Sequence, residues 1–165
     1  MLHGFPPIVS INSRVLILGS MPSVASLDDQ QYYAHPRNAF WPIQQALWGI
    51  SAQASYAQRV QVLQEKGVAV WDVLAACKRE GSLDSAIDSD SVKINDFKCF
   101  FDEYRHIKAV FFNGATAENY FKKYVLVKIS LPALVLKRLP STSPAHASLS
   151  FEKKLAQWQQ IKNYV

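Results

Sequence analysis

Short apolar runs alternate along this chain with amphipathic stretches, and this alternation constrains its fold more than any other feature. Four runs have the pattern of strands: Val15–Leu18, Val68–Leu74, Ala109–Phe112 and Leu134–Leu139. Strands that alternate with helical patterns predict a parallel sheet covered by helices on both faces. We therefore predict an α/β fold, a three-layer α/β/α sandwich with a central four-stranded parallel sheet.

The stretches between these runs carry helix start and stop signals. Ser55 is a candidate N-cap, Gly49 and Gly67 are candidate stops, and Glu152 suits the dipole at a helix N-terminus. The polar segment Lys78–Ser91 is expected to be a loop. We predict helices from Asn38 or Pro42 to Trp48, over Ser55–Lys66, from Asn95 or Asp96 to Arg105, over Ala115–Tyr124, and from Ser148 or Ser150 to about Tyr164.

Length and composition indicate one globular domain over residues 1–165. The chain has 165 residues, enough for one full core, and no Pro-, Gly- or Ser-rich linker divides it. Hydrophobic residues make up 49% and charged residues 19%, which excludes a disordered chain. Neither a signal-peptide pattern nor an apolar run of about 20 residues occurs. We therefore expect a cytoplasmic protein without a membrane partner.

Metal and cofactor chemistry find little support in the sequence. Cys77 and Cys99 are too few for a Cys-rich zinc or iron–sulfur site, and the four histidines lack metal-ligand spacing. No Walker loop, dinucleotide fingerprint or serine-hydrolase elbow occurs. We therefore predict no metal and no cofactor. Both cysteines are expected to be buried free thiols, with a disulfide between them as the alternative.

The charge balance favours a polyanionic partner. Lys and Arg number 18 against 13 Asp and Glu, so the net charge is +5 and the isoelectric point about 9.2. Each phosphate that a basic residue neutralises releases counterions, which favours nucleic acid as the partner. Charge alone is a weak signal, because many basic proteins bind no nucleic acid.

The segment Tyr32–Pro42 gathers four aromatic side chains, a histidine, an arginine and an asparagine. Aromatic faces can hold a flat ring, amides can hydrogen-bond to its edge, and a cation can bind a phosphate. Tyr32 and Tyr33 could stack on a base or pack the loop against the core, and we expect packing for one of the two. Phe40 and Trp41 are expected to anchor a helix in the core. The segment suggests a protein that grips a nucleobase.

Three polar residues of this segment each allow two interpretations. Asn38 could cap a helix, or its amide could hold a water or a base. Because an amide is no general base, Asn38 could position a nucleophile while the site stabilises the leaving group. His35 could be an acid or a donor to developing negative charge, or it could fix the loop. Arg37 could contact phosphate or remain a solvated surface charge.

Further candidates follow the predicted strands, whose carboxyl ends form the ligand-binding edge of such sheets. The turn from Gly19 to Ser23 could bind an anion or a carbonyl oxygen through its amides, or be an ordinary turn. Asp72 could be an isolated acid, or brace the site by hydrogen bonding. Asn113 could read a base edge or serve in a turn. The loop Pro140–Ala147 could press on a phosphate backbone, or connect a strand rigidly to a helix.

Four pieces of sequence together carry a family resemblance. They are Leu18-Gly19-Ser20-Met21-Pro22-Ser23, Tyr33-Ala34-His35-Pro36-Arg37-Asn38-Ala39-Phe40-Trp41, Phe112-Asn113-Gly114 and Leu139-Pro140-Ser141-Thr142-Ser143-Pro144-Ala145. In this order they resemble the uracil-DNA glycosylase superfamily, in particular its branch of hypoxanthine-DNA (deoxyinosine) glycosylases, with the mismatch-specific uracil glycosylases close to it. The resemblance implies a monofunctional glycosylase that flips a damaged base out of DNA and lets water attack the sugar carbon.

The resemblance also implies roles for individual residues. Tyr33 matches the aromatic that stacks on the extruded base, and Asn113 matches a base-reading position. Ala145 stands where a wedge enters the base stack, and because alanine is small, His146 could substitute for it. The implied base-binding set is Gly19, Ser20, Met21, Tyr33, His35 and Asn113. The implied DNA-binding set is Arg37, Ser141, Ser143, Pro144, Ala145 and His146.

Met21 is the main departure from the pattern of the superfamily. In much of the superfamily the first motif carries an Asp or Asn that activates or positions water, and methionine cannot do this. In the deoxyinosine branch the catalytic amide matches Asn38. We therefore assign catalysis to Asn38.

These observations predict a DNA glycosylase of base excision repair that removes hypoxanthine first, and uracil in G:U mismatches second. The expected partner is double-stranded DNA containing deaminated bases, with single-stranded DNA as an alternative. We expect a monomer that associates with the nucleoid when it acts on DNA. The rival hypotheses are a catalytically weak or inactive DNA-binding module on the same fold, and an enzyme of small nucleotides that uses the Gly19 turn for phosphate.

Overall fold

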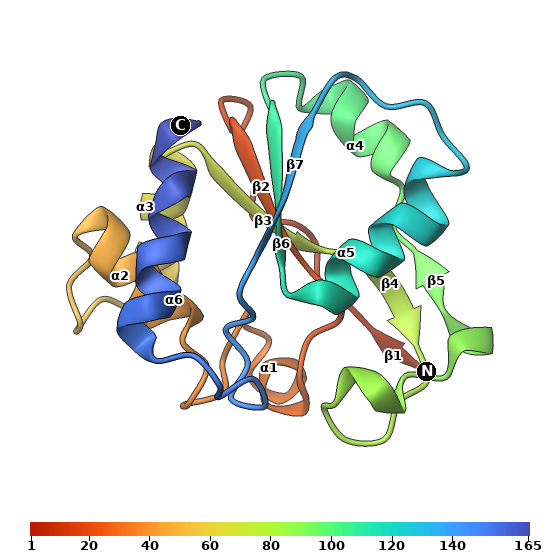
Figure 1. Ribbon diagram of the computed structural model, residues 1–165, viewed down its shortest axis with the longest axis horizontal. Coiled ribbons are helices and arrows are strands. Elements are labelled where there is room, and N and C mark those ends of the chain that lie inside the picture. The colour runs from red at the N-terminus through yellow and green to blue at the C-terminus, as the bar shows by residue number, and fades with distance from the viewer.

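The computed structural model describes all 165 residues, Met1–Val165, and is built around a four-stranded sheet (Figure 1). The strands are β2 (Val15–Gly19), β3 (Val68–Asp72), β6 (Ala109–Asn113) and β7 (Val135–Leu139), in the order β3-β2-β6-β7. Each neighbouring pair is parallel, and Val15 lies opposite both Val68 and Ala109. The predicted four-stranded parallel sheet is confirmed.

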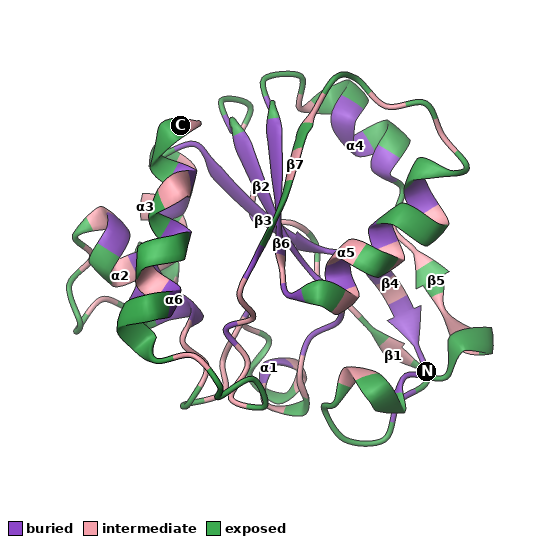
Figure 2. Cartoon of the chain, viewed as in Figure 1, coloured by how far each residue is buried: buried purple, intermediate pink, exposed green.

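Helices cover both faces of this sheet. One face carries α2 (Phe40–Trp48), α3 (Tyr56–Glu65) and α6 (Phe151–Trp158), and the other carries α4 (Phe97–Glu103) and α5 (Ala115–Phe121) (Figure 1). Val15 and Ile17 join the core under α2, α3 and α6, whereas Leu16 and Leu18 join the core under α4 and α5. This division follows because successive side chains of a strand point to opposite faces. Strands β2, β3 and β6 are buried, whereas the edge strand β7 is largely exposed (Figure 2), and the predicted three-layer sandwich is confirmed.

The predicted caps act where the sequence places them. Ser55 forms a capping box with Gln58 at the start of α3, and the side chains of Asp96 and Ser150 cap α4 and α6. Gly49 ends α2 with φ 68°, a left-handed conformation that glycine adopts without steric cost. The regular α-helices are shorter than predicted. Beyond their last turns, α5 continues as a π-helical turn and α6 as a 3-10 turn.

The predicted second strand is wrong at its C-terminal end. Strand β3 stops at Asp72, and Leu74 begins β4 (Leu74–Cys77) of a second sheet. There β4 pairs antiparallel with β1 (Leu2–His3) and with β5 (Lys93–Ile94). The local sequence does not show where the apolar run leaves the first sheet and enters the second, because the strands that pair with β4 come from remote parts of the chain.

Three other predictions need correction. The segment between Gly19 and Asn38 contains a helix, α1 (Val24–Asp29), and the predicted loop Lys78–Ser91 contains two short 3-10 turns. Both cysteines are free thiols, but only Cys77 is buried, since Cys99 lies on the exposed side of α4. None of the helices combines the length and the hydropathy that crossing a membrane requires.

Candidate active site

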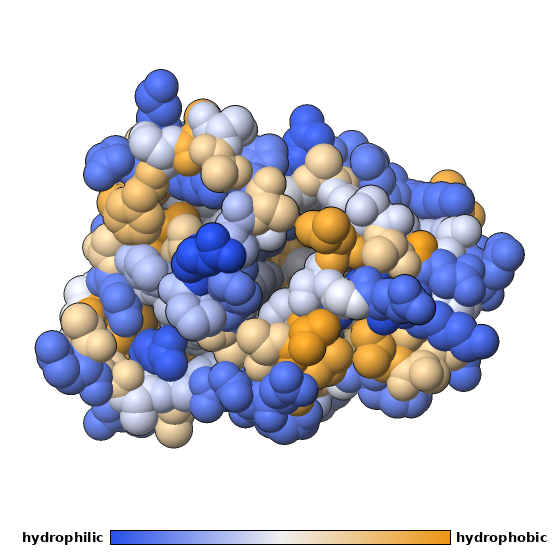
Figure 3. All heavy atoms as spheres, turned by 90° about the horizontal axis from the view of Figure 1, so that it is seen from below, coloured by the Kyte–Doolittle hydropathy of each residue, from blue (hydrophilic) through white to orange (hydrophobic).

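The loops that leave the carboxyl ends of the parallel strands surround a cavity of about 710 Å³. Figure 3 shows the molecule from this side, where its surface is hollowed near the middle. The volume falls within the range of about 300–1,000 Å³ that is usual for ligand sites. The strand ends contribute Gly19–Ser23, Asp72, Asn113–Thr116 and Arg138–Ser143 to the wall. The cavity therefore lies at the edge of the sheet where the sequence predicts ligand binding.

Most of the predicted site residues line this cavity, namely Gly19, Ser20, Met21, Tyr33, Asn38, Asn113, Ser141, Ser143, Ala145 and His146. His35, Arg37 and Pro144 do not. His35 Nδ1 accepts a hydrogen bond from the backbone of Arg37 at 3.1 Å, and its carbonyl accepts one from Asn38 N at 2.9 Å. His35 thus shapes the turn that presents Asn38. Arg37 is exposed and forms no ion pair.

The two tyrosines have separate environments. Tyr32 is buried, and its hydroxyl donates to the carbonyl of Pro6 at 2.9 Å, so this residue packs the loop against the core. Tyr33 lines the cavity, and its ring stacks on Phe40 at 4.0 Å between centroids and 21° between planes. Its backbone has φ 55°, a strained conformation for a bulky residue. The chain holds the Tyr33 ring at the cavity against that strain. Phe40 and Trp41 are both buried, as expected for helix anchors.

Asn38 lies half-buried in the cavity wall just before α2. Its Oδ1 accepts a hydrogen bond from the backbone N–H of Phe40, the first residue of α2, at 2.9 Å, but the N-cap residue of α2 is Ala39 and not Asn38. Its Nδ2 makes no hydrogen bond within the protein. A carbonyl oxygen has two lone pairs and an amide nitrogen two donors. Asn38 therefore keeps one acceptor and two donors for a water or a base.

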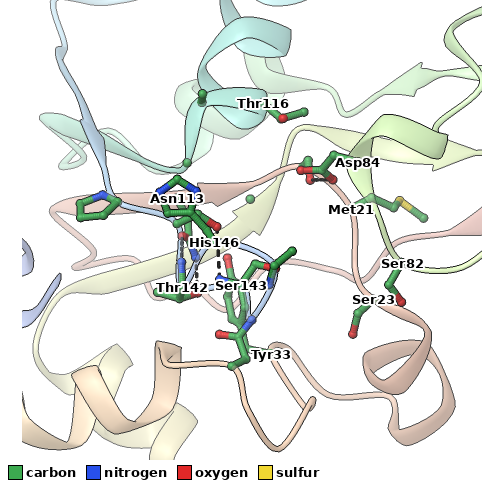
Figure 4. Close-up of a pocket in the computed structure, with 18 of the residues that line it drawn as sticks. Met21, Ser23, Tyr33, Ser82, Asp84, Asn113, Thr116, Thr142, Ser143 and His146 are labelled. Carbon is green, nitrogen blue, oxygen red and sulfur yellow. Dashed lines mark hydrogen bonds between the residues drawn. The ribbon is translucent and has the colours of Figure 1, made fainter. Parts of the chain in front are cut away.

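Asn113 joins two strand ends across the cavity. Its Nδ2 donates to Thr142 Oγ1 and its Oδ1 accepts from Thr142 N, both at 2.9 Å (Figure 4). The carbonyl of Thr142 accepts from the backbone of Ala39 at 2.9 Å, which ties this loop to the start of α2. Asn113 thus fixes the loop after β7, and keeps one donor and one lone pair free.

A sequence model of the superfamily described as "Uracil DNA glycosylase superfamily" matches residues 6–164. This chain belongs to the uracil DNA glycosylase superfamily. Membership makes DNA glycosylase its function class and DNA its partner.

Curated and solved members of the superfamily are similar to the chain over most of its length. A "Hypoxanthine DNA glycosylase" of Methanosarcina barkeri is 38% identical over 72% of this chain and 74% of its own length. A protein of the same name from Methanosarcina acetivorans is 33% identical over 96% of both chains. The solution NMR structure of a candidate uracil DNA glycosylase from Methanosarcina acetivorans superposes with a TM-score of 0.80 at 32% identity. That superposition covers 97% of this chain and 95% of the other.

The loop after β7 is held rigidly at the cavity mouth of this superfamily member. Ser143 Oγ accepts from Ala145 N at 3.2 Å, and His146 N donates to the carbonyl of Ser143 at 3.0 Å. The largely buried Lys154 donates from Nζ to the carbonyl of His146 at 2.7 Å. Ala145 and His146 are exposed at the tip. The loop therefore presents two side chains outward on a backbone that is bonded from behind.

Charged and polar side chains gather beside Met21, and the sequence assigned no role to two of them, Asp84 and Arg79. Ser20 Oγ donates to Asp84 Oδ1 at 2.6 Å, and Met21 and Asp84 lie on the same side of the cavity (Figure 4). Arg79 is buried and donates to the carbonyls of Pro22 and Gly81 at 2.6 and 2.7 Å. The segment Gly81-Ser82-Leu83-Asp84 also resembles the deoxyinosine branch in sequence, but the contact of Asp84 with Ser20, 64 residues earlier, forms only in the folded chain.

Asp72 is the buried acid of the cavity. Its side chain is 4% exposed, and Oδ2 has no hydrogen-bond partner. Burial raises the pKa of Asp72 to about 7, the charge of Asp84 adds to the rise, and Arg79 opposes it. No three His, Cys, Asp or Glu side chains gather as a metal site would require. Asp72 and Asp84 are the carboxyl groups of the cavity wall.

Proposed function

We propose that this chain is a monofunctional DNA glycosylase of base excision repair that removes deaminated bases, hypoxanthine first and uracil in G:U mismatches second. The observation that carries the proposal is the pairing of the Tyr33 ring with the Asn38 amide in one cavity. Two relatives named "Hypoxanthine DNA glycosylase" support hypoxanthine as the preferred base.

A base rotated out of the DNA stack would enter the cavity and lie on the Tyr33 ring, whose other face Phe40 supports. Flipping costs least for mismatched bases, which favours deamination products over normal pairs. Stacking contributes about 1–3 kcal/mol per base and does not depend on base identity. Selection between bases must therefore come from the polar groups of the wall.

Asn38 would position the attacking water. The free lone pair of Oδ1 can accept a hydrogen bond from that water, and Nδ2 can donate one to it or to the base. The glycosidic bond breaks as the water oxygen bonds to the sugar C1′, and the base leaves with the bonding electrons. Because an amide does not remove a proton at neutral pH, Asn38 acts by orientation.

The surface around the cavity mouth would hold the DNA. Exposed Arg37 is free to meet a phosphate, and the loop of Ser141, Ser143 and Pro144 presents Ala145 and His146 toward the vacated stack. Rigid loops that insert a side chain into a duplex are a known way to stabilise a flipped base. A net charge of +5 supports binding to double-stranded DNA, with single-stranded DNA as a second form. The proposed enzyme acts as a monomer.

Duplex oligonucleotides that carry one deoxyinosine or one deoxyuridine test the proposal. Excision, detected as strand cleavage after alkali at enzyme excess, is expected from both and faster from deoxyinosine. Asn38→Ala should lower the single-turnover rate by about 100-fold or more. Asn119→Ala, which removes an exposed amide on α5, should leave the rate unchanged. Asn38→Asp keeps the acceptor for Phe40 N, so it separates loss of the Nδ2 donors from loss of the bond to Phe40.

Three outcomes would overturn this assignment in whole or in part. Absence of product from every lesion, together with salt-dependent duplex binding, would favour the inactive DNA-binding module. An unchanged rate in Asn38→Ala would remove Asn38 from the mechanism. Hydrolysis of free deoxynucleotides without duplex binding would favour the small-nucleotide enzyme.

A further inference from the structure

Two buried polar groups lie unpartnered beside Gly19 in the cavity. They are Oδ2 of Asp72 and the hydroxyl of Tyr33. Buried polar groups in folded proteins nearly always have a hydrogen-bond partner, so an unpartnered one calls for an explanation. A bound ligand that completes the bonding is one such explanation.

Gly19 makes room for this arrangement. A Cβ atom on Gly19 would lie 2.5 Å from Asp72 Oδ1 and 2.9 Å from the Tyr33 hydroxyl. Both side chains therefore approach the same point at the end of β2, from β3 and from the loop before α2. Gly19 has no positive φ, so this close approach, and not the backbone conformation, is what requires glycine.

The Asp72 side chain has no structural task in the protein that would explain its position. Asn95 Nδ2 donates a hydrogen bond to the backbone carbonyl of Asp72 at 2.8 Å and not to its carboxyl group. The buried Arg79 directs Nε and Nη2 to backbone carbonyls and forms no ion pair with Asp72. The carboxyl therefore lies in the cavity wall without an ion pair, although the charge of Arg79 acts on it from nearby.

The surroundings of Asp72 favour its neutral, proton-donating form. The groups that interact with it electrically are Asp84, Arg79, Tyr32 and Tyr33. Burial and the negative charge of Asp84 raise the pKa of Asp72 to about 7, against the opposing effect of Arg79. A carboxyl with such a pKa can donate a proton near neutral pH and take it back, as a general acid requires.

We propose that Asp72 is the general acid of this site and protonates N7 of a purine base as it leaves. The inference rests on the proposed glycosylase function. The C1′–N9 bond breaks with its electrons moving into the purine ring, and the proton of Asp72 passes to N7. The water oxygen bonds to C1′, and a proton of that water returns to the carboxylate. Neutral hypoxanthine and an abasic sugar are the products.

This role makes Asp72 a determinant of base preference. Hypoxanthine has a basic ring nitrogen at N7, whereas the ring nitrogens of uracil are the glycosidic N1 and the protonated N3. Uracil therefore leaves as an anion that the amides and backbone N–H groups must stabilise. The acid accelerates loss of the purine and contributes little to loss of the pyrimidine.

Single-turnover excision from three duplexes tests the proposal, with deoxyinosine, 7-deaza-deoxyinosine or deoxyuridine as the lesion. Asp72→Asn keeps the side-chain size and removes the acid. It should slow deoxyinosine excision by about 100-fold or more, and deoxyuridine excision by less than about threefold. Asp28→Asn, at an exposed position without an ion pair, is the matched control and should change neither rate.

The 7-deaza substrate has a carbon in place of N7 and cannot accept the proton. The wild-type protein should therefore excise the 7-deaza base about as slowly as the Asp72→Asn variant excises hypoxanthine. With the 7-deaza substrate, Asp72→Asn should not lower the rate further. With deoxyinosine, the wild-type rate should fall about tenfold per pH unit above about pH 7, and this fall should be absent with the 7-deaza substrate.

The proposal is overturned if Asp72→Asn slows excision of deoxyinosine and of deoxyuridine by the same factor. It is also overturned if Asp72→Asn slows excision of 7-deaza-deoxyinosine as much as it slows excision of deoxyinosine. The wild-type comparison of the two purine substrates decides the matter even if the variant does not fold. If the wild-type protein excises deoxyinosine but shows neither the 7-deaza loss nor the pH dependence, only the acid role fails. If it excises no lesion, the glycosylase proposal itself fails.

Discussion

Replacing Asp72 by asparagine tests how the buried carboxyl affects folding, separately from catalysis. Burial, together with the charge of Asp84, raises the pKa of Asp72 from 3.8 to about 7. Between these two values the folded protein retains a proton that the unfolded chain has released, so wild-type stability falls as pH rises through this window. Asparagine has no such proton, and the Asp72→Asn variant should not show this loss.

The size of the effect follows from the two pKa values. One pKa unit corresponds to about 1.36 kcal/mol, so the carboxyl should cost the wild-type protein about 2.5 kcal/mol of stability between about pH 5 and pH 8. The free energy of unfolding of Asp72→Asn, taken relative to wild type, should rise by this amount over the same range.

Urea unfolding followed by tryptophan fluorescence measures this difference at the two pH values. Asp28→Asn serves as the control, because Asp28 is exposed and forms no ion pair, and its relative stability should be nearly independent of pH. If the difference in unfolding free energy between Asp72→Asn and wild type does not change with pH, burial does not raise the pKa of Asp72. A change in the opposite direction would mean that the protein stabilises the ionised carboxylate.

Three further changes have expected outcomes. Gly19→Ala places a Cβ 2.5 Å from Asp72 Oδ1, and the overpacking should lower the free energy of unfolding by about 1–3 kcal/mol in urea titrations; an unchanged midpoint would contradict the close approach. Ser55→Ala removes the capping box of α3 and should cost about 1 kcal/mol, whereas Ser148→Ala, at an exposed serine without a hydrogen bond, should cost nothing measurable. Arg37→Ala should reduce the slope of log affinity for duplex DNA against log salt by about 0.9 if Arg37 contacts one phosphate, and an unchanged slope would exclude that contact.

Several site residues were predictable because they follow strands. Gly19, Asp72, Asn113 and the loop Pro140–Ala147 each come directly after an apolar run, and the carboxyl ends of parallel strands meet at one edge. The contact of Asp84 with Ser20 was not predictable, because Asp84 lies in a polar loop whose path depends on the second sheet.

Asn38 and Asn113 each use part of the side-chain amide within the protein and leave part of it free, which only the structure shows. The sequence allowed Asn38 to be either a helix N-cap or a functional amide; in the fold Ala39 is the N-cap, and Asn38 accepts one bond from Phe40 N through Oδ1 while leaving Nδ2 free. It allowed Asn113 to read a base, and the fold uses part of that amide to hold Thr142, which lies 29 residues further along the chain. Such bonds depend on loop paths that local sequence does not specify.

The sequence by itself determined the four strands of the parallel sheet, most helix caps and the sandwich, because apolar periodicity and cap chemistry act over a few neighbouring residues. Only the tertiary structure decided the state of the acid in the cavity. Asp72 is isolated and half-neutral near pH 7 because β2, β3 and the Tyr33 turn bury it together beside Gly19. Burial, and the charges that share it, are properties of residues far apart in the chain that meet only after folding.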